Sequence, residues 1–317
     1  MKKNSSIMLF FIMMILGTTI TASSNNWLIM WTGLEINMMA FLPLIALNKL
    51  DAPEASMIYF LIQSLGSMIL LFSVLMNWNQ NILTMMAIMV KMGAAPFHFW
   101  MILIMEKMSW LNCLILMTWQ KIAPMVMIIH MKPMMMLASI SIIVGAIGGL
   151  NQSSLRKLIA FSSVNHIGWM LSISELKTFL FMKYLIMYTI MMTMMVLFLF
   201  NKKIFQLNQI TENLNMVEKI NFSIMMLSIG GLPPFLGFIT KWMVIQEMMN
   251  KSMLFLMILM IMLSMITLFF YIRMISSLML MEYNFIKSWM FHKPKKSQMM
   301  MMMTNLFILP MVAMTMI

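Results

Sequence analysis

The sequence predicts an all-α polytopic membrane protein, a single transmembrane domain over residues 1–317 with about eleven transmembrane helices. Hydrophobic residues make up 62% of the chain and charged residues only 9%, so no stretch has the composition of a soluble domain. The apolar runs are continuous, whereas the strands of a membrane barrel would alternate apolar and polar residues. Because one helical crossing takes about 20 residues, the chain with short loops accommodates roughly ten or eleven helices.

Each predicted crossing is an apolar run bounded by a short polar or charged segment. The first run follows Lys2 and Lys3, but no small-residue cleavage site comes after it, so a retained helix is expected rather than a signal peptide. The fourth and ninth runs contain internal prolines and are predicted to be discontinuous. In chain order, the crossings are expected at residues 7–22, 27–47, 55–76, 82–105, 110–130, 134–150, 155–173, 177–200, 221–249, 252–273 and 299–317.

Basic residues are distributed unequally between the two ends of these crossings. With eleven helices, 14 of the 21 Lys and Arg residues lie on or beside the side of the N-terminus, four lie on the opposite side and three lie within crossings. The N-terminal side is expected to carry the loops 48–54, 106–109, 151–154, 201–220 and 274–298. The positive-inside rule places this side where the chain is synthesised. The same excess explains the net charge of +12 without nucleic acid, and it suits anionic phospholipid such as cardiolipin.

Methionine is unusually frequent, at 54 residues, and many occupy positions where Ile or Leu would serve equally. Met is a flexible apolar filler, so this number indicates a coding bias rather than a methionine-dependent function. AT-rich animal mitochondrial genomes that read an isoleucine codon as methionine give this composition. The chain is therefore expected in the mitochondrial inner membrane, with its N-terminus in the matrix and its C-terminus in the intermembrane space.

A short internal repeat indicates two related halves. The segments Gly93–Phe97 and Gly231–Phe235 share the pattern G-x-x-P-F, and each lies within a predicted crossing. Their prolines, Pro96, Pro233 and Pro234, remove backbone donors and free carbonyl groups, which must face protein or water in a membrane. Two Gly/Pro-interrupted helices in corresponding halves point to a transport site.

The halves are predicted to be pseudo-repeats. The first spans residues 1–131 and the second spans residues 134–275, and a C-terminal helix follows at 299–317. The fold is thus expected to consist of antiporter-like inverted repeats with two discontinuous helices.

Four charged residues lie deep inside predicted apolar runs, away from their ends: Glu35, Lys91, Lys121 and Lys241. A charge at the membrane centre costs about 2.5–3.5 kcal/mol on insertion scales, so such residues are expected to have a use. Burial disfavours an ammonium group and a nearby carboxylate favours it, so a buried lysine can change protonation with its partner or its hydration. Glu35 is the expected partner of Lys91 or Lys121. The set predicts a proton path, and static ion pairs that hold helices together are the alternative.

His166 lies within a predicted helix among polar neighbours, and a histidine can relay protons near neutral pH. A hydrogen-bonded packing role is the alternative. No cluster of His, Cys, Asp and Glu has metal-ligand spacing, and one cysteine, Cys113, cannot build an iron–sulfur cluster. The glycines at 145–149 lack the strand–turn–helix setting of a dinucleotide site. No cofactor site, metal site or redox chemistry is therefore expected in this chain.

Five segments are distinctive when taken together: KMGAAPFHFW at 91–100, TWQKIAP at 118–124, LNQSSLRK at 150–157, SSVNHIGW at 162–169 and GGLPPFLGFITKW at 230–242. They resemble the antiporter-like subunit family of mitochondrial NADH:ubiquinone oxidoreductase (respiratory complex I). The resemblance covers nearly the whole chain. It implies two inverted five-helix repeats, each with a discontinuous helix.

The resemblance also implies roles for the buried ionisable residues. It matches Glu35 and Lys91 to a carboxylate–lysine pair in the first repeat and Lys121 to a central bridging lysine. It matches Lys241 to a lysine of the second broken helix. His166 corresponds to a polar position on the second repeat's side of a hydrated axis.

The expected function is that of a core membrane-arm subunit that translocates protons from matrix to intermembrane space, driven by NADH oxidation and quinone reduction elsewhere. The resemblance implies NADH, FMN, iron–sulfur clusters and ubiquinone in partner subunits, and other membrane-arm subunits as neighbours. A free-standing cation/proton antiporter and a non-transporting structural membrane subunit are the alternatives.

Overall fold

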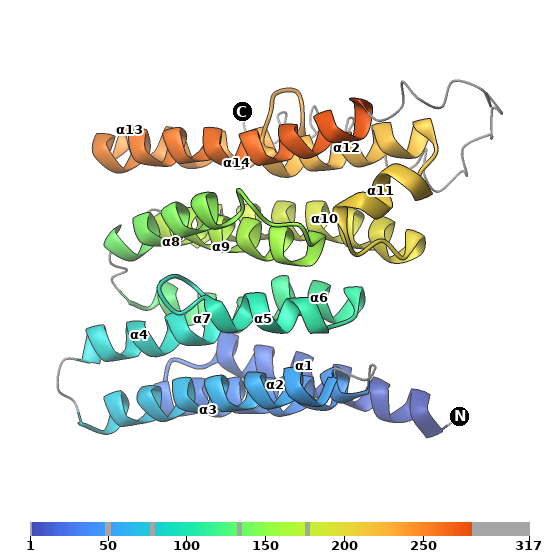
Figure 1. Cartoon of the computed structure of the whole chain (residues 1–317). Helices are drawn as coiled ribbons and strands as arrows, with labels where there is room; N and C mark the ends of the chain where they lie inside the picture. The colour runs from blue at the N-terminus through green and yellow to red at the C-terminus, as the bar shows by residue number, and fades with distance from the viewer. Residues whose placement is uncertain (1, 48–51, 77–79, 132–134, 175–177, 281–317) are drawn as a thin grey trace.

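The computed structural model describes residues 2–47, 52–76, 80–131, 135–174 and 178–280, and helices form nearly all of these ranges. Figure 1 shows a bundle whose helices follow one another in successive tiers, from α1–α3 at the bottom to α12–α14 at the top. Helices that are consecutive in the chain pack on each other, as α1 does on α2 and α8 does on α9. The last predicted crossing, 299–317, lies outside the described residues.

Seven predicted crossings are single helices in the structure. They are α1 (Lys2–Ser23), α2 (Trp27–Ala46), α3 (Ala52–Met76), α8 (Met135–Gly148), α9 (Leu155–Ser174), α10 (Thr178–Lys202) and α14 (Leu254–Leu280). In the described part of the chain, six helical segments are both long and apolar enough to cross a membrane. The polytopic all-α fold expected from the apolar runs is confirmed.

The two proline-containing crossings are discontinuous, as predicted. The first consists of α4 (Gln80–Met92) and α5 (Phe99–Lys107), and the second of α12 (Met216–Gly230) and α13 (Leu236–Asn250). After each first half comes a glycine with positive φ, 70° at Gly93 and 81° at Gly231. Residues with a Cβ rarely adopt this conformation, so glycine allows the helix to end immediately before the proline segment.

The predicted crossing over 110–130 is present as the membrane-length helical segment Trp110–Ile129, but it has an interruption that was not predicted. Thr118 separates α6 (Trp110–Met117) from α7 (Trp119–Ile129). The Thr118 hydroxyl donates to the carbonyl of Leu114 at 2.7 Å, and Pro124 lacks the N–H that would bond to the carbonyl of Gln120. Hydroxyl back-bonding and proline are both known causes of helix bending. The interruption places Lys121 beside a distorted turn.

The segment 201–220, predicted as a loop, contains the short helix α11 (Leu207–Asn213) and the first turn of α12. Reciprocal capping between Gln206 and Gln209 starts α11, and Asn215 with Glu218 does the same for α12. These side chains bind the N–H groups that a helix start leaves without partners. The polar stretch is therefore helical rather than irregular. Helix α14 also continues to Leu280, beyond the predicted end at residue 273.

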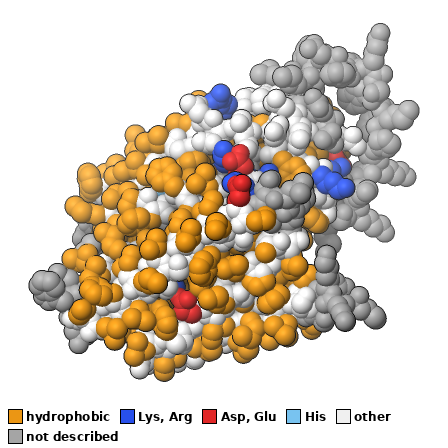
Figure 2. All heavy atoms as spheres, turned by 60° about the horizontal axis from the view of Figure 1, so that its bottom comes forward, with side chains coloured by type: hydrophobic (Ala, Val, Ile, Leu, Met, Phe, Trp, Pro, Cys, Tyr) orange, Lys and Arg blue, Asp and Glu red, His pale blue; other side chains and the backbone are white. Residues whose placement is uncertain are grey.

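The outer helices expose apolar side chains. On α1 and α3 the side chains of Met8, Leu9, Met57, Leu65 and Met68 are all more than half exposed. Figure 2 shows a face covered mainly by hydrophobic side chains, with charged atoms confined to a few small groups. A soluble protein rarely exposes an apolar surface this continuous, and lipid tails would cover it without cost.

Several of the loops assigned to the N-terminal side meet at one end of the bundle. Three contacts join them: the ion pairs Glu54–Lys107 and Glu106–Lys157, and a backbone bridge between Ser154 and Gln206. Ion pairs between exposed side chains contribute only about 0–1 kcal/mol each. These contacts show that loops distant in the sequence are neighbours in space.

Candidate functional site

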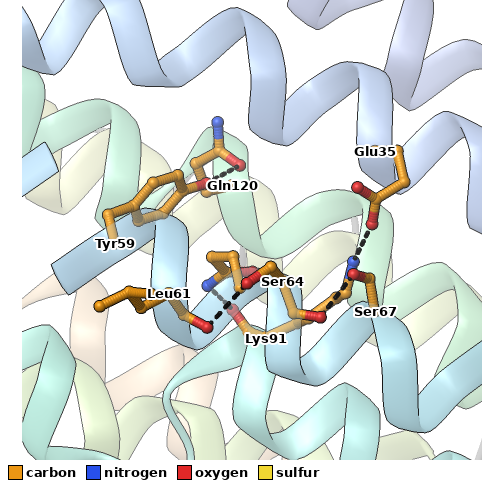
Figure 3. Close-up of polar contacts among 8 residues, drawn as sticks. Glu35, Tyr59, Leu61, Ser64, Ser67, Lys91 and Gln120 are labelled. Carbon is orange, nitrogen blue, oxygen red and sulfur yellow. Dashed lines mark hydrogen bonds and ion pairs between the residues drawn. The ribbon is translucent and has the colours of Figure 1, made fainter. Parts of the chain in front are cut away.

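Of the two lysines considered as partners for Glu35, Lys91 makes the contact. Lys91 Nζ donates to Glu35 Oε1 at 3.2 Å, joining α4 to α2 (Figure 3). The Lys91 side chain is buried, whereas the Glu35 side chain is 21% exposed. The Glu35 carboxylate is therefore only partly enclosed by this chain.

Lys91 lies in the last turn of α4, directly before the helix break. The carbonyl groups freed by the break have side-chain partners. Gln63 Nε2 donates to the Lys91 carbonyl oxygen at 3.1 Å, and Trp100 Nε1 donates to the Val90 carbonyl oxygen at 3.0 Å. Unpaired carbonyl groups are costly in a membrane, so these contacts from α3 and α5 stabilise the break and hold Lys91 in place.

Lys121 extends from α7 toward the second half of the bundle. Its Nζ donates to the carbonyl oxygen of Ser163 at 3.2 Å and lies 5.3 Å from the centre of the Tyr188 ring. A carbonyl dipole and a ring face carry only partial negative charge. The contacts of Lys121 therefore orient its amine without neutralising a charge on it.

Lys241 occupies α13, beyond the second helix break. Its Nζ donates to the carbonyl oxygen of Gly230 at 2.7 Å and lies 5.7 Å from the centre of the Trp169 ring. This lysine thus binds a carbonyl freed by the second break, as Gln63 does at the first. Among the described residues, no ion pair includes Lys121 or Lys241.

Helix α9 connects these two lysines. Ser163, His166 and Trp169 follow one another at a spacing of three residues, so they share one face of the helix. Lys121 contacts Ser163 at one end of this face, and Lys241 lies over Trp169 at the other. At 1.5 Å per residue, the two ends are about 9 Å apart along the helix. His166 therefore lies between the two lysines.

His166 is enclosed by the bundle, with 2% of its surface exposed. Its Nδ1 lies 2.8 Å from Tyr184 Oη, and its ring lies 5.0 Å from the ring of Tyr188. A histidine bound to a hydroxyl can pass a proton. The same hydrogen bond also satisfies a packing histidine, so relay activity stays a prediction.

A small cavity lies between Lys91 and Lys121. Both lysines line it, together with the uncharged polar side chains of Asn37, Tyr59, Gln63 and Gln120. These four residues were not predicted as part of the site. Each was visible as a polar residue inside an apolar run, but a search for charged groups passes over amides and phenols.

The site contains amines, a carboxylate, an imidazole, phenols and amides. The amines, the carboxylate and the imidazole can bind or release a proton, and the phenols and amides donate and accept hydrogen bonds. Within the described ranges, no group of three or more His, Cys, Asp or Glu residues has the geometry to hold a metal ion. Cys113 is buried in α6, where its Sγ contacts the carbonyl of Met105.

Comparison with protein families places the chain among membrane transport subunits. A family model described as NADH:quinone oxidoreductase/Mrp antiporter, TM matches residues 24–83 and 75–267. These matches include both helix breaks and the residues Glu35, Lys91, Lys121 and Lys241.

Individual proteins show the same relationship. NADH-ubiquinone oxidoreductase chain 2 of Anopheles gambiae is 44% identical over 309 residues, covering 92% of this chain and 90% of that protein. The chain 2 of Aedes aegypti matches with the same identity and coverage. A chain of respiratory complex I from Thermus thermophilus superposes with a TM-score of 0.79 at 20% identity, over 96% of this chain and 77% of that one. The last match concerns the fold alone.

Proposed function

The chain belongs to the NADH-ubiquinone oxidoreductase chain 2 family, and we propose that it translocates protons from the mitochondrial matrix to the intermembrane space as a membrane-arm subunit of that enzyme. The observation that carries this proposal is a series of ionisable groups through an apolar bundle. Glu35 binds Lys91, a polar cavity follows, and Lys121 contacts the face of α9 that leads past His166 to Lys241.

In this proposal, Glu35 controls how readily Lys91 keeps its proton, because a carboxylate at 3.2 Å favours the ammonium form. Lys121 receives the proton or responds to the charge on Lys91, His166 carries it along α9, and Lys241 lies toward the exit. In this proposal each lysine amine can hold a proton, and the positive charges of the protonated lysines repel one another. Energy comes from NADH oxidation and quinone reduction in other subunits.

The redox groups belong to partner subunits in this proposal. NADH, FMN, iron–sulfur clusters and ubiquinone act elsewhere in the enzyme, and the neighbours of this chain are other membrane-arm subunits and phospholipid such as cardiolipin. The basic loops at one end of the bundle suit anionic head groups. That end would face the matrix, with the N-terminus there and the C-terminus in the intermembrane space.

The division into two pseudo-repeats, residues 1–131 and 134–275, belongs to the same proposal. Its support is the parallel construction of the two breaks. Each has a glycine of positive φ, a following proline segment and a freed carbonyl bound by a side chain. The repeats would then move or hydrate as separate units around the shared α7–α9 contact.

Glu35→Gln is expected to lower coupled proton translocation by at least about tenfold, equivalent to ~1.4 kcal/mol of barrier. The amide keeps the size of the side chain but removes the negative charge, so the Lys91 ammonium loses its counter-charge in a membrane. The measurement is proton uptake per NADH oxidised, with the assembled complex in liposomes. Glu54→Gln serves as a control because Glu54 is an exposed carboxylate paired with Lys107. Equal pumping by Glu35→Gln and wild type would contradict the role of Glu35.

The family model also covers Mrp antiporters, so a free-standing cation/proton antiporter is the second candidate. Native-gel fractionation of gently solubilised mitochondria, with mass spectrometry and an NADH:quinone activity stain, separates the two. We expect this chain to migrate only with the large NADH-oxidising band. Migration alone at small mass, followed by ion flux through the purified chain, would instead support the antiporter. Full activity after substitution of all three lysines would support a purely structural subunit.

A further inference from the structure

Lys91 and Lys121 face a common cavity but do not bind each other. Lys91 Nζ binds Glu35, and Lys121 Nζ binds the carbonyl of Ser163. A proton that passes between the two amines therefore needs an intermediate carrier. The cavity that both lysines line is the place where the structure leaves room for one.

Gln120 connects the walls of this cavity. Its Nε2 donates to Asn37 Oδ1 at 3.2 Å. Its Oε1 accepts from Tyr59 Oη at 3.5 Å, as Figure 3 shows. The amide is thus bound to α2 on one side and to α3 on the other. Gln120 immediately precedes Lys121 on α7, so the same turn positions the amide and the lysine.

The lining decides what the cavity holds. A cavity with apolar walls stays dry, whereas polar walls with several donors and acceptors bind water. This cavity has amide, phenol and amine groups around a space just large enough for a water molecule. An amide side chain is not itself an acid or base near neutral pH, so Gln120 can orient water but cannot store the proton.

We propose that Gln120 is the positioning residue for proton transfer from Lys91 to Lys121, because its amide orients the water that this cavity holds. The inference rests on the proposed function. In the transfer, an N–H bond of the Lys91 ammonium breaks and its proton passes to water, while the water gives another of its protons to the neutral amine of Lys121. Lys91 becomes neutral, Lys121 becomes an ammonium, and the water is regenerated.

Gln120→Leu tests this role because it keeps the approximate size of the side chain and removes its hydrogen bonds to Asn37, Tyr59 and Met14 Sδ. In the assembled complex, we expect NADH oxidation coupled to proton uptake to fall about tenfold, equivalent to ~1.4 kcal/mol. Because proton transfer then limits the rate, the solvent isotope effect on coupled oxidation should rise above the wild-type value. Oxidation of NADH by a water-soluble acceptor, which bypasses the quinone, should not change.

Asn112→Leu is the matched control. Asn112 is also a buried amide, and its Nδ2 donates to the carbonyl of Leu44 at 2.8 Å, away from the residues that line the cavity. Loss of this bond is expected to lower the thermal stability of the complex without changing the isotope effect. If Gln120→Leu does not assemble, Tyr59→Phe tests the same junction, since it removes one hydrogen bond and preserves the ring. It should slow coupled oxidation and raise the isotope effect.

The outcomes separate this inference from the function on which it rests. A wild-type rate and isotope effect in Gln120→Leu, together with lost pumping in Lys121→Met, would overturn the role of Gln120 alone. Unchanged pumping in both variants would overturn the proton path as well. Equal isotope effects in Gln120→Leu and Asn112→Leu would show that Gln120 has only a structural role.

Discussion

Lys121→Met is expected to lower coupled proton translocation by roughly 10²-fold, the lower end of what a positioned acid–base group contributes. Methionine matches the length and apolar stem of lysine but has no group that takes up a proton. Because the Lys121 amine is buried and forms its described contacts with a carbonyl and a ring face, its removal leaves no opposite charge without a partner. The complex should therefore assemble normally. The measurement compares proton uptake with NADH oxidation by an artificial acceptor.

Two further variants decide what Lys121 does. Lys121→Arg keeps a positive charge, but the guanidinium group of arginine does not release its proton in proteins. This variant should therefore also lose pumping. Full pumping by Lys121→Arg would show that a fixed charge is sufficient and that no proton passes through this residue. Lys157→Met is the matched control because Lys157 is partly exposed and paired with Glu106 at the end of the bundle. It should pump at the wild-type rate.

Gly237→Ala is expected to have the largest effect on stability. A Cβ at Gly237 would lie 1.7 Å from the carbonyl oxygen of Ser228 and 3.0 Å from its carbonyl carbon. These are backbone atoms of α12, so no rotation of a side chain relieves the clash, and α12 and α13 must move apart at the second break. Overpacking typically costs about 1–3 kcal/mol, and a clash with backbone places this variant at or above the upper end. We expect little assembled chain on native gels and a lowered temperature of inactivation.

Gly230→Ala is the control for this prediction. Its added Cβ would also be close to another atom, 2.6 Å from Leu268 Cδ2, but a terminal methyl group can rotate away. Alanine also has the higher helix propensity by about 1 kcal/mol. We expect near-normal assembly of Gly230→Ala. Normal assembly of Gly237→Ala would mean that the close approach of α12 and α13 is not required for the fold.

The sequence by itself determined the membrane-spanning helices, the two breaks and the identity of the buried ionisable residues. These properties are local. Twenty apolar residues suffice to predict a crossing, and a glycine followed within a few residues by proline ends a helix wherever it occurs. Lys91, Lys121 and Lys241 were recognisable because a charge within an apolar run is costly whatever surrounds it. The interruption at Thr118 and the short helix α11 were not predicted. Their causes, a hydroxyl hydrogen bond and a pair of capping side chains, are weak signals in a sequence.

Only the tertiary structure decided which of these groups meet. The contact of Glu35 with Lys91 joins residues 56 positions apart, and that of Asn37 with Gln120 joins residues 83 positions apart. Such pairs depend on the rotation and height of packed helices, which hydrophobicity does not specify because lipid and protein neighbours are equally apolar. For the same reason, the cavity and the alignment of Ser163, His166 and Trp169 between two lysines emerge only from packing. The sequence supplies the proton-binding groups, and the helix contacts turn them into a path.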